Sequence, residues 1–153
     1  LSLLCHSMGN YVLKHTLLTS DSVTRDLVFD NVCLVAADTN NQNHRDWVGR
    51  LDTRKRCYVV INENDSALKA SRIKPGDEQL ARLGHYLRKL DSDNAMYINL
   101  TAADEVGSEH SYFKGSAVRN NARLSAMFER MFTGQAVEDL MEYRVDLNTY
   151  ELK

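Results

Sequence analysis

Apolar residues along the chain alternate between short continuous runs and stretches at helical spacing. The continuous runs predict buried strands, at residues 1–5, 30–38, 55–65 and 95–104. The segments at helical spacing predict helices over residues 8–20, 77–90 and 116–134, with a short helix inside 43–51. We expect no firm structure for the mixed segment 138–153.

Strands that alternate with helices predict βαβ units, and therefore a mainly parallel sheet with helices on both faces. Strands that are continuously apolar fit a sheet that is buried on both sides. The expected fold class is therefore α/β, a three-layer sandwich. We divide the chain into a main domain over residues 1–133 and a C-terminal tail over residues 134–153.

The composition indicates one globular domain, with 153 residues, of which 43% are hydrophobic and 26% charged. A net charge of −2 argues against a nucleic-acid partner, and the apolar runs are too short to span a membrane. The cysteines lie in apolar runs, which favours buried thiols and a reducing compartment such as the cytoplasm. We expect no metal and no cofactor, because no HExxH, paired Cys/His spacing, P-loop or GxGxxG is present.

The opening stretch LSLLCHSMGNYVLKHTLL places Ser7 at the predicted turn between a strand and a helix. The carboxyl edge of a parallel sheet is where ligands collect, so a serine there is a candidate nucleophile. A sharp turn needs small neighbours two residues away, and here these are Cys5 and Gly9. The backbone N–H of Met8 is expected to donate to a developing oxyanion. The alternative is a serine that only caps the helix.

The stretch CHSMGN resembles the nucleophile elbow, G-x-S-x-G, of the α/β-hydrolase superfamily. It departs from that pattern at Cys5, where glycine is commonest. The chain is similar to bacterial α/β-hydrolases of unknown function, in which a short polar loop after a later strand carries the triad acid. The resemblance covers residue 1 to about residue 133 and implies the C-terminal half of such a fold.

The resemblance implies an acid and then a histidine further along the chain, each after a strand. Asp65 closes the third predicted strand, and His110 lies in the loop that follows the fourth. Ser7 is then the nucleophile, His110 the general base and acid, and Asp65 the group that orients the imidazole. Asp38, at the end of the second predicted strand, is the alternative acid.

The other histidines compete less well for the role of base. His44 follows the second predicted strand and is the main rival. His85 lies away from the leucine face of its predicted helix, so we expect it to be exposed. His15 is expected to be packed or exposed on the first helix. His6 belongs to the elbow itself and is expected to face away from the serine.

The expected function is therefore serine-dependent hydrolysis of a small-molecule carboxylic ester through an acyl-enzyme, as in esterases and lipases. The alternative is a noncatalytic hydrolase-like domain that serves interaction or assembly. Three leucines of the predicted helix 77–90 could line an acyl pocket, but packing on the sheet is the simpler expectation: Leu80, Leu83 and Leu87.

A full α/β-hydrolase has strands and helices before the elbow, and a loop among them supplies the second oxyanion N–H. Because these elements are missing here, we expect the chain to be a piece of such a fold. Losing one oxyanion donor costs about 2.7–4 kcal/mol, so catalysis is expected to be weak. An apolar edge strand tends to pair with another chain, so we also expect a homo-oligomer formed through residues 1–5.

Overall fold

A parallel sheet forms the centre of the computed structural model, which describes residues 1–19, 28–73 and 80–152. Four of its parallel strands fall in the continuous apolar runs: β1 (Leu3–His6), β2 (Asn31–Val35), β3 (Arg56–Ile61) and β4 (Ala95–Asn99). Every residue of β2 and all but the first of β3 are buried. The predicted strands are confirmed, although β2 to β4 end earlier than expected because the last residues of the predicted runs form bends, turns and loops.

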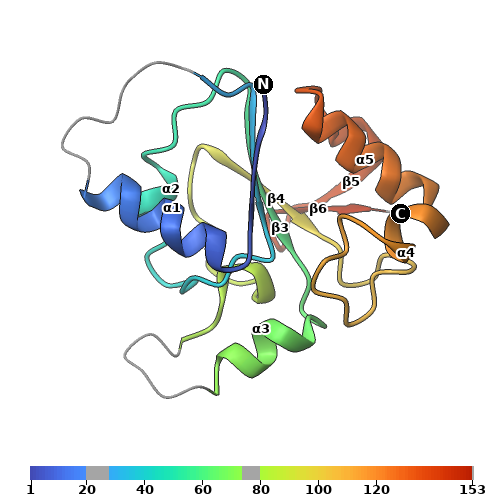
Figure 1. The fold of residues 1–153 in the computed structure, drawn as a ribbon, viewed down its shortest axis with the longest axis horizontal. Helices are drawn as coiled ribbons and strands as arrows, with labels where there is room; N and C mark the ends of the chain where they lie inside the picture. The colour runs from blue at the N-terminus through green and yellow to red at the C-terminus, as the bar shows by residue number, and fades with distance from the viewer. Residues whose placement is uncertain (20–27, 74–79, 153) are drawn as a thin grey trace.

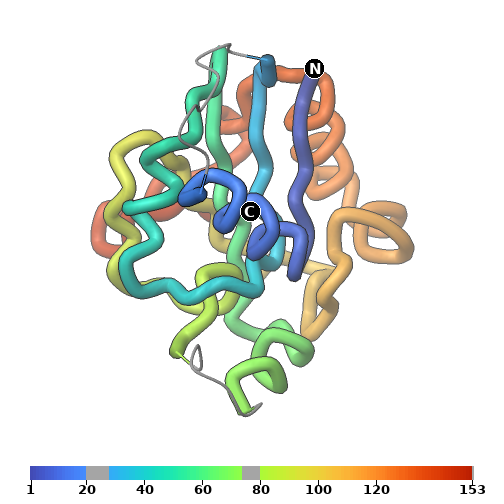
Figure 2. The backbone as a smooth tube through the Cα atoms, turned by 60° about the vertical axis from the view of Figure 1, so that its left-hand side comes forward, coloured from blue at the N-terminus to red at the C-terminus, as the bar shows by residue number. Residues whose placement is uncertain are grey.

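The sheet has six strands in the order β1-β2-β3-β4-β6-β5, so that β1 lies at one edge. The last two strands come from the segment for which the sequence suggested no structure: β5 (Met141–Arg144) and β6 (Thr149–Leu152). Strand β6 pairs in parallel with β4, and β5 pairs antiparallel with β6. Residues 141–152 of the predicted C-terminal tail therefore add a hairpin to the same sheet as the strands of residues 1–133. Figure 2 shows β1, β2 and β3 running side by side.

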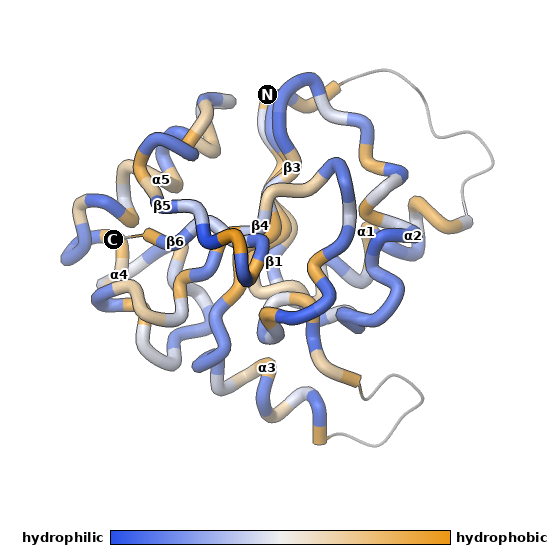
Figure 3. The backbone as a smooth tube through the Cα atoms, turned by 180° about the vertical axis from the view of Figure 1, so that it is seen from behind, coloured by the Kyte–Doolittle hydropathy of each residue, from blue (hydrophilic) through white to orange (hydrophobic). Residues whose placement is uncertain are grey.

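Helices cover both faces of the sheet, as the α/β prediction requires (Figure 1). On one face lie α1 (Met8–Thr19) and α2 (Arg45–Val48), packed on Leu34 and Val59. On the other face lie α4 (Ser116–Asn120) and α5 (Ala122–Phe132). They pack on the residues that alternate with the first set, Cys33 and Tyr58 among them. Figure 3 shows the apolar strands inside this arrangement and polar loops around it. None of the described helices is long and apolar enough to cross a membrane.

The long helix predicted over residues 116–134 is broken at Asn121. This residue has an extended backbone, with φ −119° and ψ 101°. Its side-chain oxygen accepts a hydrogen bond from the backbone N–H of Leu124 at 3.0 Å, and so caps the start of α5. The apolar spacing continues through the break, which explains why periodicity alone joined the two helices.

The helix predicted over residues 77–90 is wrong. Residues 77–79 lie outside the described part of the chain, and residues 80–90 contain only a short 3-10 turn, η1 (Leu83–His85). The backbone of Gly84 lies against the turn after β2, where its N–H donates to the Ala37 carbonyl at 3.0 Å. A Cβ at Gly84 would come within 2.2 Å of the Ala37 nitrogen. This close contact and bond hold the segment against the chain after β2 instead of in a helix.

The leucines of this segment still meet the core. Leu83, Leu87 and Leu90 are buried in the cluster that α1 and α2 cover, whereas Leu80 is 47% exposed. The expected exposure of His85 is also wrong, because only 9% of this residue is exposed. Its side chain turns inward with the 3-10 turn, which contacts β3 and α3 (Ser66–Ser71), a helix that the sequence pattern does not predict.

Candidate active site

Ser7 forms the whole connection between β1 and α1. Its φ of 53° lies in the left-handed region, which is strained for a residue with a side chain. The N–H of Ser7 donates to the Val35 carbonyl at 3.1 Å, and its own carbonyl accepts from the Asp38 N–H at 3.3 Å. The turn is therefore sharp and strained, as the elbow prediction requires, and it is tied to the carboxyl end of β2.

Asn10 is a second residue that holds this turn, and it is not among the site residues that the sequence predicts. It is fully buried on α1. Its Nδ2 atom donates to the carbonyls of Cys5 at 3.0 Å and of Ser7 at 3.2 Å. The signal that the sequence offers for this role is an amide three residues after the serine, at helical spacing from the apolar residues Leu13 and Leu17.

The groups beside Ser7 are arranged in part as expected. The N–H of Met8 belongs to the first residue of α1, where helix geometry supplies no intrahelical acceptor, so it is available to an incoming oxygen. Gly9 is less constrained than the elbow pattern suggests, because a Cβ at this position would meet nothing within 4 Å among the described residues. Cys5 is half-buried.

Asp65 lies directly after the turn that ends β3 and is fully buried. One carboxylate oxygen caps α3, accepting from the N–H groups of Ala67 and Leu68 at 3.0 Å each. The other oxygen lies 2.7 Å from Nδ1 of His110. Two sequence-predicted site residues thus contact each other directly, although they come from different strands.

Asp65 fixes the orientation of the His110 ring. A carboxylate can only accept, so Nδ1 of His110 carries the hydrogen, and Nε2 is left with a lone pair in the neutral ring. The His110 side chain is 24% exposed. In the described part of the chain, Ser7 Oγ makes no hydrogen bond with His110, so a contact between these groups belongs to the proposal below.

Hydrogen bonds from the β3–α3 junction hold the chain that leads to His110. Asn62 Nδ2 donates to the carbonyl of Gly107 at 3.0 Å. The backbone N–H and the hydroxyl of Ser66 both donate to the carbonyl of Ser108 at 3.3 Å. The residues before His110 are therefore attached to the same junction that carries Asp65.

Tyr112 holds the chain on the other side of His110. Its buried hydroxyl donates to the Val60 carbonyl at 3.2 Å and accepts from the Ala36 N–H at 3.1 Å. Burial raises the pKa of this phenol far above its usual range, so it stays a neutral donor. The sequence does not predict this role for Tyr112, because nothing in its spacing distinguishes it from a core aromatic residue.

Asp38, the alternative acid, has other partners. Its Oδ1 atom lies 3.0 Å from Nε of Arg82 and accepts a hydrogen bond from the Ser71 hydroxyl at 2.7 Å. Both side chains of the ion pair are largely buried. Asp38 thus joins the segment after β2 to α3 and to the chain before η1, and no histidine is among its partners.

The rival histidines also lie in other surroundings. His44 is buried and bonded through both ring nitrogens, to the Asn41 carbonyl and to the Tyr97 hydroxyl. His15 is exposed on α1, with its ring 4.2 Å from that of Tyr11. Among the described residues, neither histidine has an acid bonded to one ring nitrogen while the other is free: Asp91 lies 3.9 Å from Nε2 of His44, which already bonds to Tyr97.

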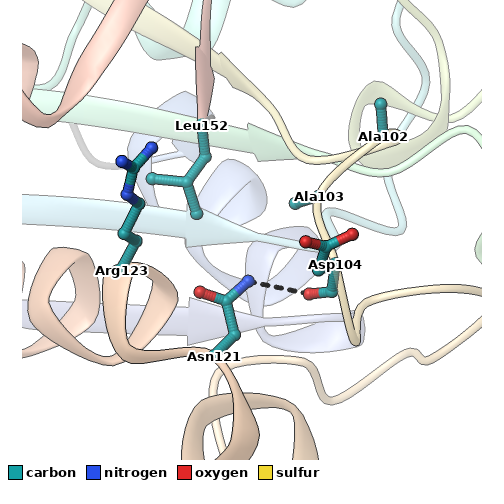
Figure 4. Close-up of a pocket in the computed structure, with 6 residues that line it drawn as sticks. All are labelled: Ala102, Ala103, Asp104, Asn121, Arg123 and Leu152. Carbon is teal, nitrogen blue, oxygen red and sulfur yellow. Dashed lines mark hydrogen bonds between the residues drawn. The ribbon is translucent and has the colours of Figure 1, made fainter.

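A pocket of about 360 Å³ lies beyond the end of β4. Figure 4 shows Arg123 on α5 and Asp104 on the β4 side of this pocket, with Leu152 between them and Asn121 bonded to the Asp104 carbonyl. None of Ser7, Asp65 and His110 lines it. Among the described residues, no group of three or more His, Cys, Asp or Glu side chains is placed to hold a metal ion.

A serine at a strained strand-to-helix turn of a parallel sheet, followed in the chain by an acid and then a histidine, is the layout of an α/β-hydrolase. Residues 1–118 match the family described as "Alpha/beta hydrolase of unknown function (DUF900)". The match covers more than half of the chain, so the chain belongs to this family, and Ser7, Asp65 and His110 all fall inside the matched region. No curated protein and no solved structure matches the chain.

Proposed function

We propose that the protein is a serine hydrolase that cleaves a small-molecule carboxylic ester, with Ser7, His110 and Asp65 as its triad. The observation that carries the proposal is the 2.7 Å contact between Asp65 and Nδ1 of His110. Both residues follow the carboxyl ends of parallel strands, as Ser7 does after β1. Family membership supports hydrolysis as the reaction class.

In the first half of the proposed reaction, Ser7 Oγ attacks the ester carbonyl carbon and passes its proton to Nε2 of His110. The carbonyl oxygen becomes an oxyanion and accepts a hydrogen bond from the Met8 N–H. The tetrahedral intermediate then collapses. The bond to the alcohol oxygen breaks, His110 returns the proton to that oxygen, and an acyl-enzyme remains on Ser7.

In the second half, His110 takes a proton from a water molecule, and the resulting hydroxide attacks the acyl carbon. Collapse of the second intermediate releases the carboxylic acid, and the proton returns to Ser7 Oγ. Asp65 stabilises the imidazolium that forms in each half and keeps Nδ1 protonated, without itself taking the proton. No cofactor enters these steps.

Hydrolysis of p-nitrophenyl butyrate tests the proposal. The unmodified chain is expected to release p-nitrophenol, and Ser7→Ala is expected to reduce the rate to that of buffer. Ser125→Ala, which removes an exposed hydroxyl from α5, is the matched control and should keep the full rate. Release that is unaffected by Ser7→Ala would overturn the assignment of Ser7 as the nucleophile.

The edge position of β1 favours a second proposal, that two or more chains associate through this strand. In the described part of the chain, no strand pairs with the outer edge of β1, whose residues are half-buried throughout, and such an edge is a template for pairing. Sedimentation at micromolar concentration is expected to give a dimer or larger species, which Leu3→Lys should shift toward the monomer. A monomeric unmodified chain would contradict it. Specific association that Ser7→Ala leaves intact, without ester hydrolysis, would favour the noncatalytic alternative.

A further inference from the structure

His6, the last residue of β1, touches the segment that carries the proposed base. Its Nε2 atom lies 3.0 Å from the backbone carbonyl of His110, a residue 104 positions away in the chain. The two imidazole rings are also in contact, with centroids 4.6 Å apart and their planes tilted by 50°. His6 thus contacts both the backbone and the ring of His110.

The direction of this hydrogen bond follows from its acceptor. A carbonyl oxygen can only accept, so Nε2 of His6 carries the hydrogen and donates it. The bond persists whether the His110 ring is neutral or protonated, because it uses the backbone carbonyl and not a ring nitrogen. It can therefore hold the His110 segment in place through a whole catalytic cycle.

The surroundings of His6 keep its own ring neutral. Burial is the main cause that lowers the pKa of His6, and the charges of His110 and Lys114 lower it further. The bond to the His110 carbonyl and the charge of Asp65 act in the opposite direction. On its other side the ring packs against Phe113, with centroids 5.0 Å apart. A neutral ring here avoids a second positive charge beside the imidazolium that His110 is proposed to become.

We propose that His6 is a positioning residue that attaches His110, the proposed base, to the nucleophile elbow. It does so by the hydrogen bond from its Nε2–H to the His110 carbonyl and by the contact between the two imidazole rings. This inference rests on the proposed function. Asp65 bonds to Nδ1 of the His110 ring, and the contacts from His6 restrain the same residue from the β1 side. Because His6 directly precedes Ser7, one residue links the position of the base to that of the nucleophile.

Two measurements on the same variants test this role. The first is the resonance of the His110 Nδ1 proton in ¹⁵N-labelled protein, identified by its loss in His110→Gln. The second is the rate at which a fluorophosphonate probe labels Ser7. His6→Ala removes both contacts, His6→Gln restores a side-chain N–H donor, and His6→Phe restores only a ring. His15→Ala, which removes an exposed imidazole from α1, is the matched control.

His6→Ala is expected to broaden or abolish the Nδ1 resonance and to slow labelling roughly ten- to hundredfold, because misplacement of a catalytic group has effects of this size. His6→Gln should restore part of both readouts, and His15→Ala should change neither. A resonance and a labelling rate unchanged in His6→Ala would overturn the proposal. So would a loss of thermal stability with the resonance intact, since that describes a structural role alone.

The two readouts separate this inference from the proposed function. The resonance reports the Asp65–His110 contact and does not require a reactive serine. If Ser7 of the unmodified chain is not labelled but the resonance depends on His6, the hydrolase proposal fails while the positioning role stands. If Ser7 is labelled at the same rate with and without His6, the positioning role fails while the hydrolase proposal stands.

Discussion

Asp65 Oδ2 lies 2.7 Å from Nδ1 of His110, across 45 residues of chain. The pairing depends on two separate junctions, the start of α3 and the loop after β4, that the parallel sheet brings to one edge. The second oxygen of Asp65 is occupied by the N–H groups of Ala67 and Leu68. The carboxylate is therefore fixed by helix capping, and its free oxygen is aimed at the imidazole.

Asp65→Asn is expected to lower the labelling of Ser7 on the order of 10³- to 10⁴-fold. The amide can still cap α3 through Oδ1, so the fold should remain, but its NH₂ group cannot accept the hydrogen on His110 Nδ1. The ring is then no longer held in the productive tautomer. The measurement is the rate of fluorophosphonate labelling, with circular dichroism to check the fold.

Asp38→Asn is the matched control, since it is the same substitution at the same sheet edge. Its carboxylate pairs with Arg82 and Ser71, so we expect a loss of about 2 kcal/mol in the free energy of unfolding. Labelling of Ser7 should fall far less than in Asp65→Asn. A larger loss of labelling in Asp38→Asn would mean that Asp38 is the triad acid.

Ser7→Gly is expected to be more stable than Ser7→Ala by about 1 kcal/mol, although both lack the hydroxyl. The left-handed φ of 53° is strained for alanine and free of strain for glycine. Urea denaturation of the two variants measures this difference directly. Equal stabilities would show that the elbow relaxes out of the left-handed region when the serine is removed.

Gly84→Ala is expected to lower the free energy of unfolding by about 3 kcal/mol or more. The new Cβ would lie 2.2 Å from the Ala37 nitrogen. The other near atoms belong to the Ala36 backbone, so no flexible side chain can move away. Gly9→Ala is the control, because its Cβ would meet nothing within 4 Å of the described chain. In a helix it should be neutral or stabilising by about 0.5 kcal/mol. Similar losses in both variants would contradict the close contact at η1.

Stability is expected to fall as the pH drops below about 6.5, the ordinary pKa of histidine. Burial is the main cause that lowers the pKa values of His6, His44 and His85 in the folded chain. The unfolded chain therefore binds more protons in this range, so acid shifts the equilibrium toward it. The contribution is fully present above the unfolded value and is lost as the pH falls toward the lowered folded values.

Urea midpoints from about pH 8 to about pH 5.5 measure this decline. His85→Leu should make it shallower, because both buried nitrogens of His85 lack a partner among the described residues and cannot be protonated without cost. His15→Gln, which replaces an exposed ring on α1, is the control. If the urea midpoint of His85→Leu declines with pH as steeply as that of the unmodified chain, His85 does not contribute to the loss of stability in acid.

The parallel strands and α1 could be predicted because their sequence patterns are local. The apolar run of β3 and the helical spacing after Ser7 each lie within one segment. The segment 80–90 could not be predicted in this way, because what prevents a helix is the contact between Gly84 and the backbone after β2. The C-terminal hairpin was missed because β6 finds its partner, β4, only in the folded sheet.

The same distinction holds at the site. Ser7, Asp65 and His110 could be chosen from their order and their places after strands, and the structure brings Asp65 and His110 together. The residues that support them depend on contacts across the chain. Asn10 and Tyr112 bond to backbone carbonyls of neighbouring strands, and a single sequence carries no direct record of such bonds. Their only sequence signal is a polar or aromatic residue at a buried position.

The most direct test of the proposed triad is to treat the chain with a fluorophosphonate probe and to locate the adduct by mass spectrometry. The proposal predicts an adduct on Ser7 that disappears in His110→Ala and persists in His44→Ala, the rival histidine. No adduct on Ser7, or an adduct that survives His110→Ala and disappears in His44→Ala, would contradict it.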